Sequence, residues 1–117
     1  MKILVVDDSP FARLQMRQIL EENGHSVVGE AQDAPSACAK YKELSPEVMT
    51  LDMVMPGGGG LEVLIALQGT KPAPRVIIVS SLNDQALEPV RDLGVKHVLH
   101  KPVDWAELKV ALQDLAK

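Results

Sequence analysis

Short runs of apolar residues divide the chain at regular intervals. The clearest runs are Ile3–Val6, Val48–Leu51, Val76–Val79 and Val98–Leu99, and Val27–Val28 is a weaker fifth. The first three are too short for helices, are rich in β-branched residues and are bounded by Asp, Ser, Pro or Gly, so they predict strands. Because their apolar residues do not alternate with polar ones, both faces of each strand are expected to be covered, which is typical of a parallel sheet.

The segments between these runs show helical spacing. Ser9 suits the N-cap of the first helix, Pro10 its first position and Gly24 its end. Helices are predicted, in chain order, at about 10–23, 35–43, 60–68, 84–93 (opening after Asn83 or Asp84) and from 105 onward, where Asp104 is the cap. Their expected buried residues are Ala12, Met16, Ile19 and Leu20; Ala37, Cys38 and Tyr41; Leu61, Leu64 and Ile65; Ala86, Val90 and Leu93; and Leu108, Ala111, Leu112 and Leu115.

Strand and helix therefore alternate five times, with short connections and no repeat or low-complexity tract. This alternation predicts an α/β fold, a doubly wound parallel sheet with right-handed crossovers. A chain of 117 residues has the length of one domain and buries enough surface for a core of its own. We expect residues 1–117 to form that single domain.

Composition narrows the possible classes of protein and of partner. Hydrophobic residues make up 46% and charged residues 24%, as in an ordinary globular protein. The single cysteine, Cys38, cannot close an intrachain disulfide, which favours a reducing compartment. A net charge of −4 argues against nucleic acid or an anionic membrane as the main partner. No run approaches the roughly 18 apolar residues of a membrane span, and Asp7 and Asp8 interrupt any signal peptide, so we predict a cytoplasmic protein.

The polar residues that follow the predicted strands are the candidates for chemistry, because open parallel sheets bind ligands at the carboxyl ends of their strands. These residues are Asp7 and Asp8, Asp52, Ser80 and Ser81, and Lys101. Three carboxylates at one rim repel one another and either raise a pKa or attract a cation, and oxygen ligands suit Mg²⁺. A carboxylate beside such an ion can attack phosphorus, with Lys101 offsetting charge on the phosphoryl oxygens and Ser80 donating a hydrogen bond.

These residues carry a resemblance to a known family. Its motifs are Val5–Ser9 with Arg13, Leu51–Asp52 followed by Met55–Pro56, Ser80 after an apolar strand, and Lys101–Pro102. Over essentially all of its length the chain resembles a response-regulator receiver domain, and in particular the stand-alone receivers of chemotaxis. The resemblance implies a five-stranded sheet in the order 2-1-3-4-5 flanked by five helices. It also implies two-component signal transduction, in which a sensor histidine kinase or a histidine phosphotransfer protein supplies a phosphoryl group and partner binding changes.

The resemblance assigns roles by position. Asp52 resembles the phosphoacceptor, Lys101 the phosphate-contacting lysine and Ser80 the switch hydroxyl. The Mg²⁺ ligands that it implies are Asp7, Asp8, Asp52 and the backbone carbonyl of Val54. It implies no enzyme activity beyond self-phosphorylation from a phosphodonor and autodephosphorylation. The expected target is a protein bound at the face of the fourth helix, fifth strand and fifth helix, with no nucleic acid or membrane partner. The expected oligomeric state is a monomer or a weak dimer that depends on phosphorylation.

Three features depart from the family pattern. Val98 stands where many receivers have a switch aromatic, so rotation of an aromatic ring at this position cannot signal phosphorylation. Val54 and Leu82 are apolar where the family places polar groups that orient the hydrolytic water, which predicts a long-lived phosphorylated state. The glycines at 57–60 lie beside Asp52 and predict a mobile loop.

Two alternatives follow from these observations. The stretch Val79–Leu82 resembles the receivers of chemotaxis methylesterases, so the chain could be the regulatory receiver of a longer enzyme. The 117 residues contain no G-x-S-x-G motif, and such an activity would lie outside them. The second alternative is a receiver-like interaction domain that never receives phosphate, for which the valine at position 98 is the argument.

Overall fold

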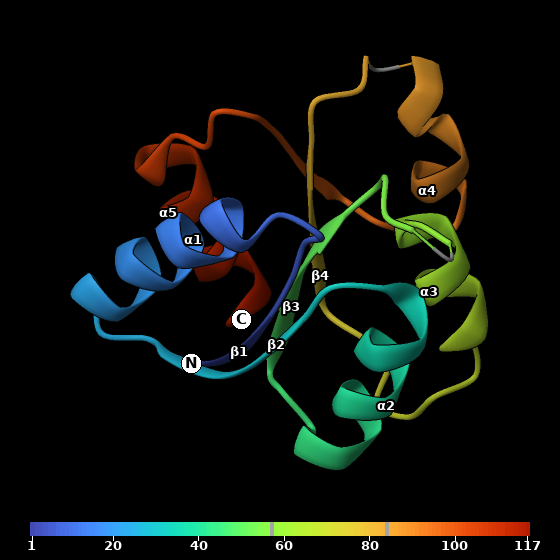
Figure 1. The fold of residues 1–117 in the computed structure, drawn as a ribbon, viewed down its shortest axis with the longest axis horizontal. Helices are drawn as coiled ribbons and strands as arrows, with labels where there is room; N and C mark the ends of the chain where they lie inside the picture. The colour runs from blue at the N-terminus through green and yellow to red at the C-terminus, as the bar shows by residue number, and fades with distance from the viewer. Residues whose placement is uncertain (57, 84) are drawn as a thin grey trace.

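Five parallel strands form one sheet in the order β2-β1-β3-β4-β5 (Figure 1). The computed structural model describes residues 1–56, 58–83 and 85–117. The strands are β1 (Lys2–Val6), β2 (Ser26–Ala31), β3 (Val48–Asp52), β4 (Val76–Ser80) and β5 (His97–His100). The predicted fold class and strand order are confirmed. The strand order reverses beside β1, which pairs with both β2 and β3, so the carboxyl ends of β1 and β3 adjoin at the place where such sheets bind ligands.

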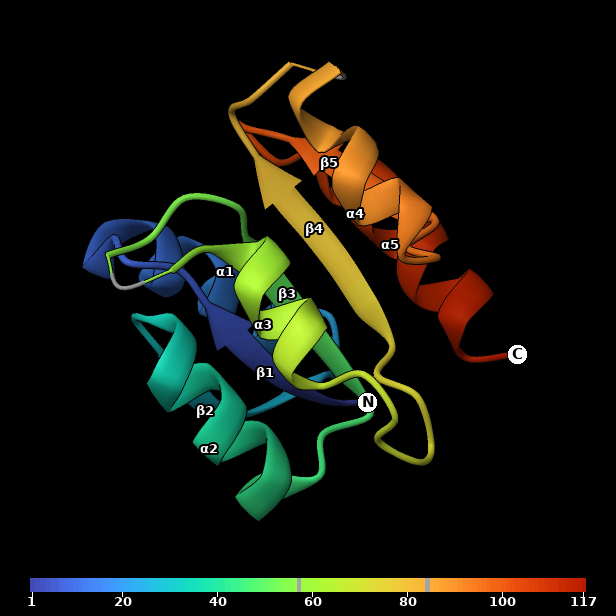
Figure 2. The same cartoon turned by 90° about the vertical axis from the view of Figure 1, so that its right-hand side faces the viewer.

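Helices cover both faces of the sheet. The helices are α1 (Pro10–Glu22), α2 (Ala34–Leu44), α3 (Gly60–Ala66), α4 (Glu88–Asp92) and α5 (Trp105–Leu115), with a short 3₁₀ turn at Gln85–Leu87. One face of the sheet carries α1 and α5, and the other carries α2, α3 and α4; Figure 2 looks onto that second face. None of the helices in the described residues is long and apolar enough to cross a membrane.

The strands contribute alternate residues to two cores, one on each side of the sheet. In β1, Ile3 and Val5 pack with α1 and α5, whereas Leu4 and Val6 pack with α2 and α3. All four of these side chains are buried. Continuous hydrophobicity along a strand is therefore explained by burial on both faces, as the sequence predicted.

Side-chain caps start two of the helices, α1 and α5, where the sequence placed them. The Ser9 hydroxyl accepts a hydrogen bond from the backbone N–H of Ala12 at 3.2 Å, and Pro10 follows as the first residue of α1. Asp104 caps α5 through the N–H of Ala106 at 2.9 Å. These bonds satisfy backbone donors that have no partner inside the helix. Because Ser9 directly follows the acidic pair, the cap also sets the direction of the chain as it leaves β1.

The fourth helix differs from its prediction. Asn83 accepts a hydrogen bond from the N–H of Ala86 and opens a 3₁₀ turn, and α4 begins only at Glu88. Pro89 explains the break, because it has no N–H to continue the hydrogen-bond ladder. The buried residues are Leu87 and Val90, whereas Ala86 and Leu93 are exposed. The alternative cap, Asp84, lies outside the described residues.

The buried face of α3 was predicted only in part. Val63, which was not expected inside, is fully buried, and so is Leu67 just after the helix. Ile65, which was expected inside, is 52% exposed. Leu61 and Leu64 are partly buried against the core. Nearly every residue of this short helix is apolar, so its own pattern does not select one face.

Candidate functional site

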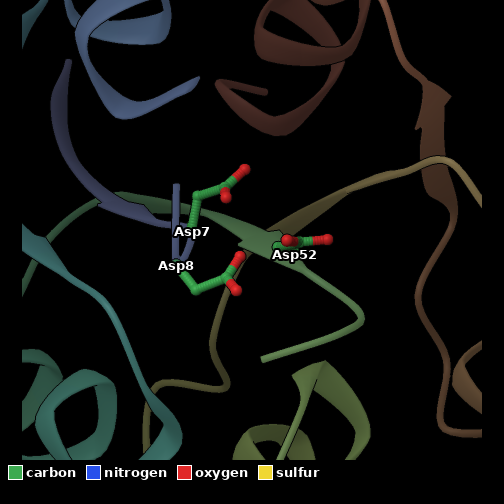
Figure 3. A group of neighbouring side chains, drawn as sticks. All are labelled: Asp7, Asp8 and Asp52. Carbon is green, nitrogen blue, oxygen red and sulfur yellow. The ribbon is translucent and has the colours of Figure 1, made fainter. Parts of the chain in front are cut away.

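Three carboxylates converge at the carboxyl end of the sheet. Asp52 is the last residue of β3, and Asp7 and Asp8 directly follow β1. Each residue places a carboxylate oxygen within 4.8 Å of the others (Figure 3). Asp7 and Asp52 are buried, whereas Asp8 is exposed to solvent. The group therefore lies at an open rim and has a buried floor, as the positions of these residues at the strand ends predicted.

Backbone hydrogen bonds hold Asp7 in place. Its N–H donates to the carbonyl of Ala31 at 3.0 Å, which extends the pairing of β1 with β2 by one residue. Its Oδ1 accepts from the N–H of Ser9 at 2.9 Å. The same serine caps α1, so one short turn orients the carboxylate and starts the helix.

Among the described residues, Lys101 is the only lysine or arginine that forms an ion pair with this acidic group. Its ammonium lies 2.8 Å from Oδ2 of Asp7 and 3.6 Å from Oδ2 of Asp52. The peptide bond between Lys101 and Pro102 is cis. Burial acts to lower the pKa of Lys101, but the hydrogen bond to Asp7 and the charge of Asp52 outweigh it, and the pKa is raised. The lysine is therefore a permanent cation at this site.

A single cation does not balance three carboxylates. Burial raises the pKa of Asp52, and the charge of Asp7 raises it further, against the lowering effect of Lys101 and of the Val54 N–H. The Val54 N–H donates to Oδ1 of Asp52 at 3.5 Å, a long hydrogen bond. Unbalanced negative charge and a set of donors made only of oxygen atoms fit a small divalent cation such as Mg²⁺. The residues present therefore suit the ion that the sequence predicted.

Ser80 ends β4 beside this group. Asp52 pairs in register with Val79, and Ser80 is the next residue. The Ser80 side chain is buried, and its Oγ accepts a hydrogen bond from the N–H of Leu82 at 3.0 Å. Its carbonyl accepts from the N–H of Lys101 at 3.0 Å. Since Oγ acts as an acceptor in this contact, its hydrogen remains available for donation to a ligand.

The departures from the family pattern occupy different environments. The Val54 side chain is 59% exposed on the loop after β3. Leu82 and Val98 are partly buried and pack against the core that contains α3 and α4. Val98 pairs in register with Ile78 of β4, so an apolar contact occupies the position of the switch aromatic.

Glycines close the loop between Asp52 and α3. A Cβ atom on Gly59 would lie 1.9 Å from the carbonyl oxygen of Met53, and one on Gly60 would lie 2.8 Å from that of Asp52. The N–H of Gly60 donates to the Met53 carbonyl at 3.2 Å. Gly59 and Gly60 are thus needed for close backbone approach, whereas Gly57 lies outside the described residues. Mobility of this loop stays a prediction.

One residue near the site was missed. Glu30, near the end of β2, was not among the candidates, but its carboxylate receives hydrogen bonds from Arg13 and Arg17 of α1. Arg13 in turn donates to the backbone carbonyl of Asp7. The arginine belongs to the sequence motif, but the sequence carries no signal that pairs it with Glu30, 17 positions later.

A doubly wound sheet with an acidic group and a lysine at its carboxyl edge defines a receiver domain of two-component systems. A model of the response regulator receiver domain family matches residues 3–113, and the chain belongs to that family. Members of this family act as signal transducers that work with kinases and downstream targets, and they bind Mg²⁺ at an acidic cluster.

Three known proteins show how the chain compares within the family. It is 48% identical over 108 residues to protein-glutamate methylesterase/protein-glutamine glutaminase 5 of Myxococcus xanthus, which covers 90% of this chain but only 31% of that protein. It is 31% identical to the chemotaxis protein CheY of Thermotoga maritima, covering 99% and 98% of the two chains. The crystal structure of the CheX–CheY–BeF3–Mg²⁺ complex from Borrelia burgdorferi superimposes with a TM-score of 0.92 at 29% identity, covering 100% of this chain and 90% of that one. The chain thus spans about a third of one relative and nearly all of another.

Proposed function

We propose that this chain is a phosphorylation-gated binding module in which Asp52 is the phosphoacceptor. Residues 1–117 would form one receiver domain that takes a phosphoryl group from a histidine kinase or a histidine phosphotransfer protein. The observation that carries the proposal is the convergence of Asp7, Asp8, Asp52 and Lys101 at one rim with more negative than positive charge. Their oxygen atoms and the ammonium are the groups that phosphoryl transfer needs.

The acidic residues would hold Mg²⁺. Asp7, Asp8 and Asp52 supply carboxylate oxygens, and the backbone carbonyl of Val54 is the further ligand implied by the family pattern. When bound, the ion neutralises charge on the phosphoryl oxygens during transfer. Asp8 is the exposed member of the group, so an ion held there would be accessible to a phosphodonor.

The transfer step uses the carboxylate of Asp52 as nucleophile. One of its oxygens attacks phosphorus, the new O–P bond replaces the P–N bond of phosphohistidine, and the electron pair leaves with the imidazole nitrogen. Lys101 would then offset the charge of the phosphoryl oxygens, and the Ser80 hydroxyl would donate to one of them. The chain itself catalyses no reaction on another substrate in this scheme, only its own phosphorylation and dephosphorylation.

The change would be transmitted to the face made by α4, β5 and α5. Phosphorylation adds nearly two negative charges beside Ser80, whose hydroxyl accepts a hydrogen bond from Leu82 and whose carbonyl accepts one from Lys101. Drawing the hydroxyl toward the phosphoryl group breaks the contact with Leu82 and releases the loop that leads to α4. A groove of about 480 Å³ between β5 and α5, beside the exposed Val110, is where a protein target would bind. The same face would carry a weak phosphorylation-dependent dimer of an otherwise monomeric protein. The proposal includes a cytoplasmic location and neither nucleic acid nor a membrane as partner.

A second candidate rests on the methylesterase relative. The chain matches about a third of that protein at 48% identity, which favours a receiver that regulates an enzyme domain on the same polypeptide. Both candidates share the phosphorylation step and differ in whether the target is attached. The full reading frame distinguishes them.

The phosphorylation step is tested by intact-mass analysis. The wild type, incubated with acetyl phosphate and Mg²⁺, is expected to gain the mass of one phosphoryl group, and Asp52→Ala is expected to gain none. Asp92→Asn, on exposed α4, is the matched control and should behave as wild type. A wild type that gains no mass would support the alternative of a phosphate-independent interaction domain.

A further inference from the structure

Arg13 clamps the peptide bond that joins the two acidic residues after β1. Its Nη1 donates to the carbonyl oxygen of Asp7 at 2.7 Å, and that carbonyl belongs to the peptide unit between Asp7 and Asp8. The Arg13 side chain is 15% exposed, so the contact is shielded from water. Asp8 is exposed and is not held by burial. Its position depends on how firmly this stretch of backbone is fixed.

Glu30 in turn fixes Arg13. Its Oε1 accepts from Nε of Arg13 at 3.1 Å, and its Oε2 accepts from Nε of Arg17 at 3.0 Å. Both carboxylate oxygens are therefore engaged by α1. The Glu30 carbonyl also accepts from the ammonium of Lys40 on α2. Glu30 thus joins the end of β2 to helices on both faces of the sheet, and its hold on Arg13 orients the guanidinium toward Asp7.

We propose that Arg13 and Glu30 are positioning residues for the metal site, and that Arg13 acts on the Asp7–Asp8 backbone while Glu30 acts through Arg13. Neither residue contributes an oxygen to the acidic group, so their effect is on the placement of its ligands. Partners that orient ligands in this way commonly change metal affinity by 10- to 100-fold when removed. The inference rests on the proposed Mg²⁺ site.

Charge and positioning predict opposite results for one substitution. Arg13 is a cation close to a site that would bind a cation, so removing it should strengthen Mg²⁺ binding if only charge mattered. If Arg13 positions Asp7 and Asp8, its removal should weaken binding despite the loss of a repelling charge. Removing Glu30 weakens binding under both accounts. Arg13→Ala is therefore the decisive variant.

The test is a titration of the phosphate-free protein with Mg²⁺ by isothermal titration calorimetry. We expect the Kd of Arg13→Ala and of Glu30→Ala each to rise about tenfold. The double variant should match Arg13→Ala alone, because Glu30 acts through the arginine. Glu21→Ala is the matched control, since Glu21 contacts Arg17 but neither Arg13 nor the acidic group, and its Kd should equal that of wild type within twofold.

The outcomes separate this inference from the proposed function. Arg13→Ala with an unchanged or lower Kd overturns the positioning role while leaving the metal site intact. A wild type that does not bind Mg²⁺ at millimolar concentration overturns the site itself. Circular dichroism of each variant identifies the folded fraction, and a purely structural role would lower the unfolding midpoint without changing the Kd of the folded protein.

Discussion

The ammonium of Lys101 lies closer to Asp7 than to Asp52, at 2.8 Å against 3.6 Å. Before phosphorylation the lysine is therefore held mainly by a carboxylate that would bind the metal, and the proposed acceptor is only partly neutralised. The same lysine donates its backbone N–H to the Ser80 carbonyl. A shift of the ammonium toward a phosphoryl group on Asp52 would thus begin from a residue already linked to the end of β4.

Lys101→Ala should destabilise the protein most strongly when Mg²⁺ is absent. Without the ammonium, the buried carboxylates of Asp7 and Asp52 repel each other, and we expect the free energy of unfolding in EDTA to fall by about 1–3 kcal/mol. Excess Mg²⁺ should recover most of this loss, because it binds only the folded state and replaces the missing charge. Urea denaturation with and without Mg²⁺ measures both terms. Lys109→Ala, on an exposed position of α5, is the control, and equal stabilisation of wild type and Lys101→Ala by Mg²⁺ would contradict the argument.

The raised pKa of Asp52 predicts a dependence of stability on pH. Burial and the charge of Asp7 cause the shift, so between the ordinary pKa and the folded-state pKa the folded protein binds more protons than the unfolded chain. The free energy of unfolding therefore falls as pH rises through that window. Asp52→Asn removes the penalty and should be more stable than wild type at pH 7 in EDTA. The difference should disappear below the ordinary carboxyl pKa of about 4.

Urea denaturation of Asp52→Asn and wild type tests this expectation. The measurements run from about pH 3.5 to 8, a range that extends from below the ordinary carboxyl pKa to neutral pH. Asp92→Asn serves as the control for loss of one exposed carboxylate on α4. Should Asp52→Asn prove less stable than wild type at pH 7, the attraction of Lys101 would outweigh burial and the repulsion of Asp7.

Apolar residues at two positions predict slow loss of the phosphoryl group. Val54 follows Asp52 by two positions, and Leu82 follows Ser80 by two, so neither side chain can orient a hydrolytic water by hydrogen bonding. The double variant Val54→Asn, Leu82→Glu should shorten the half-life of the phosphorylated form by about tenfold or more. A time course of intact mass after removal of the phosphodonor gives the rate. Val110→Asn replaces an exposed valine on α5 and controls for the added polarity alone. A half-life that is unchanged or longer in the double variant would contradict the prediction.

Gly59→Ala should disturb the site from its backbone side. The new Cβ would lie 1.9 Å from the Met53 carbonyl, so the loop must move away from the end of β3. We expect a loss of about 2–4 kcal/mol in the free energy of unfolding, measured by urea denaturation, and slower phosphorylation of Asp52. Gly24→Ala is the control: it has open space for a Cβ at a φ of +86°, and should cost only about 1 kcal/mol from backbone strain. Equal losses of unfolding free energy in the two variants would contradict this prediction, because they would show that the loop accommodates a Cβ on Gly59 at no additional cost.

Local patterns predicted most elements and missed the faces of the shortest ones. Ser9 and Asp104 were identifiable as caps because a cap bonds to a backbone N–H only a few residues away. In α3, by contrast, Val63 and Ile65 are both apolar, and only the packing of the helix against the rest of the core decides which of them turns inward. Pro89 was visible in the sequence, but its division of the fourth helix was not predicted.

By itself the sequence determined the order of the elements, the burial of both strand faces and the residues brought to the rim, Asp7, Asp52 and Lys101 among them. These features follow from hydrophobic patterning and from the geometry that all open parallel sheets share. Only the tertiary structure decided that Lys101 contacts Asp7 more closely than Asp52, and that Glu30 holds Arg13 against the acidic backbone. Such contacts depend on ångström-scale placement of elements far apart in the chain, which packing of the whole core sets and no local pattern records.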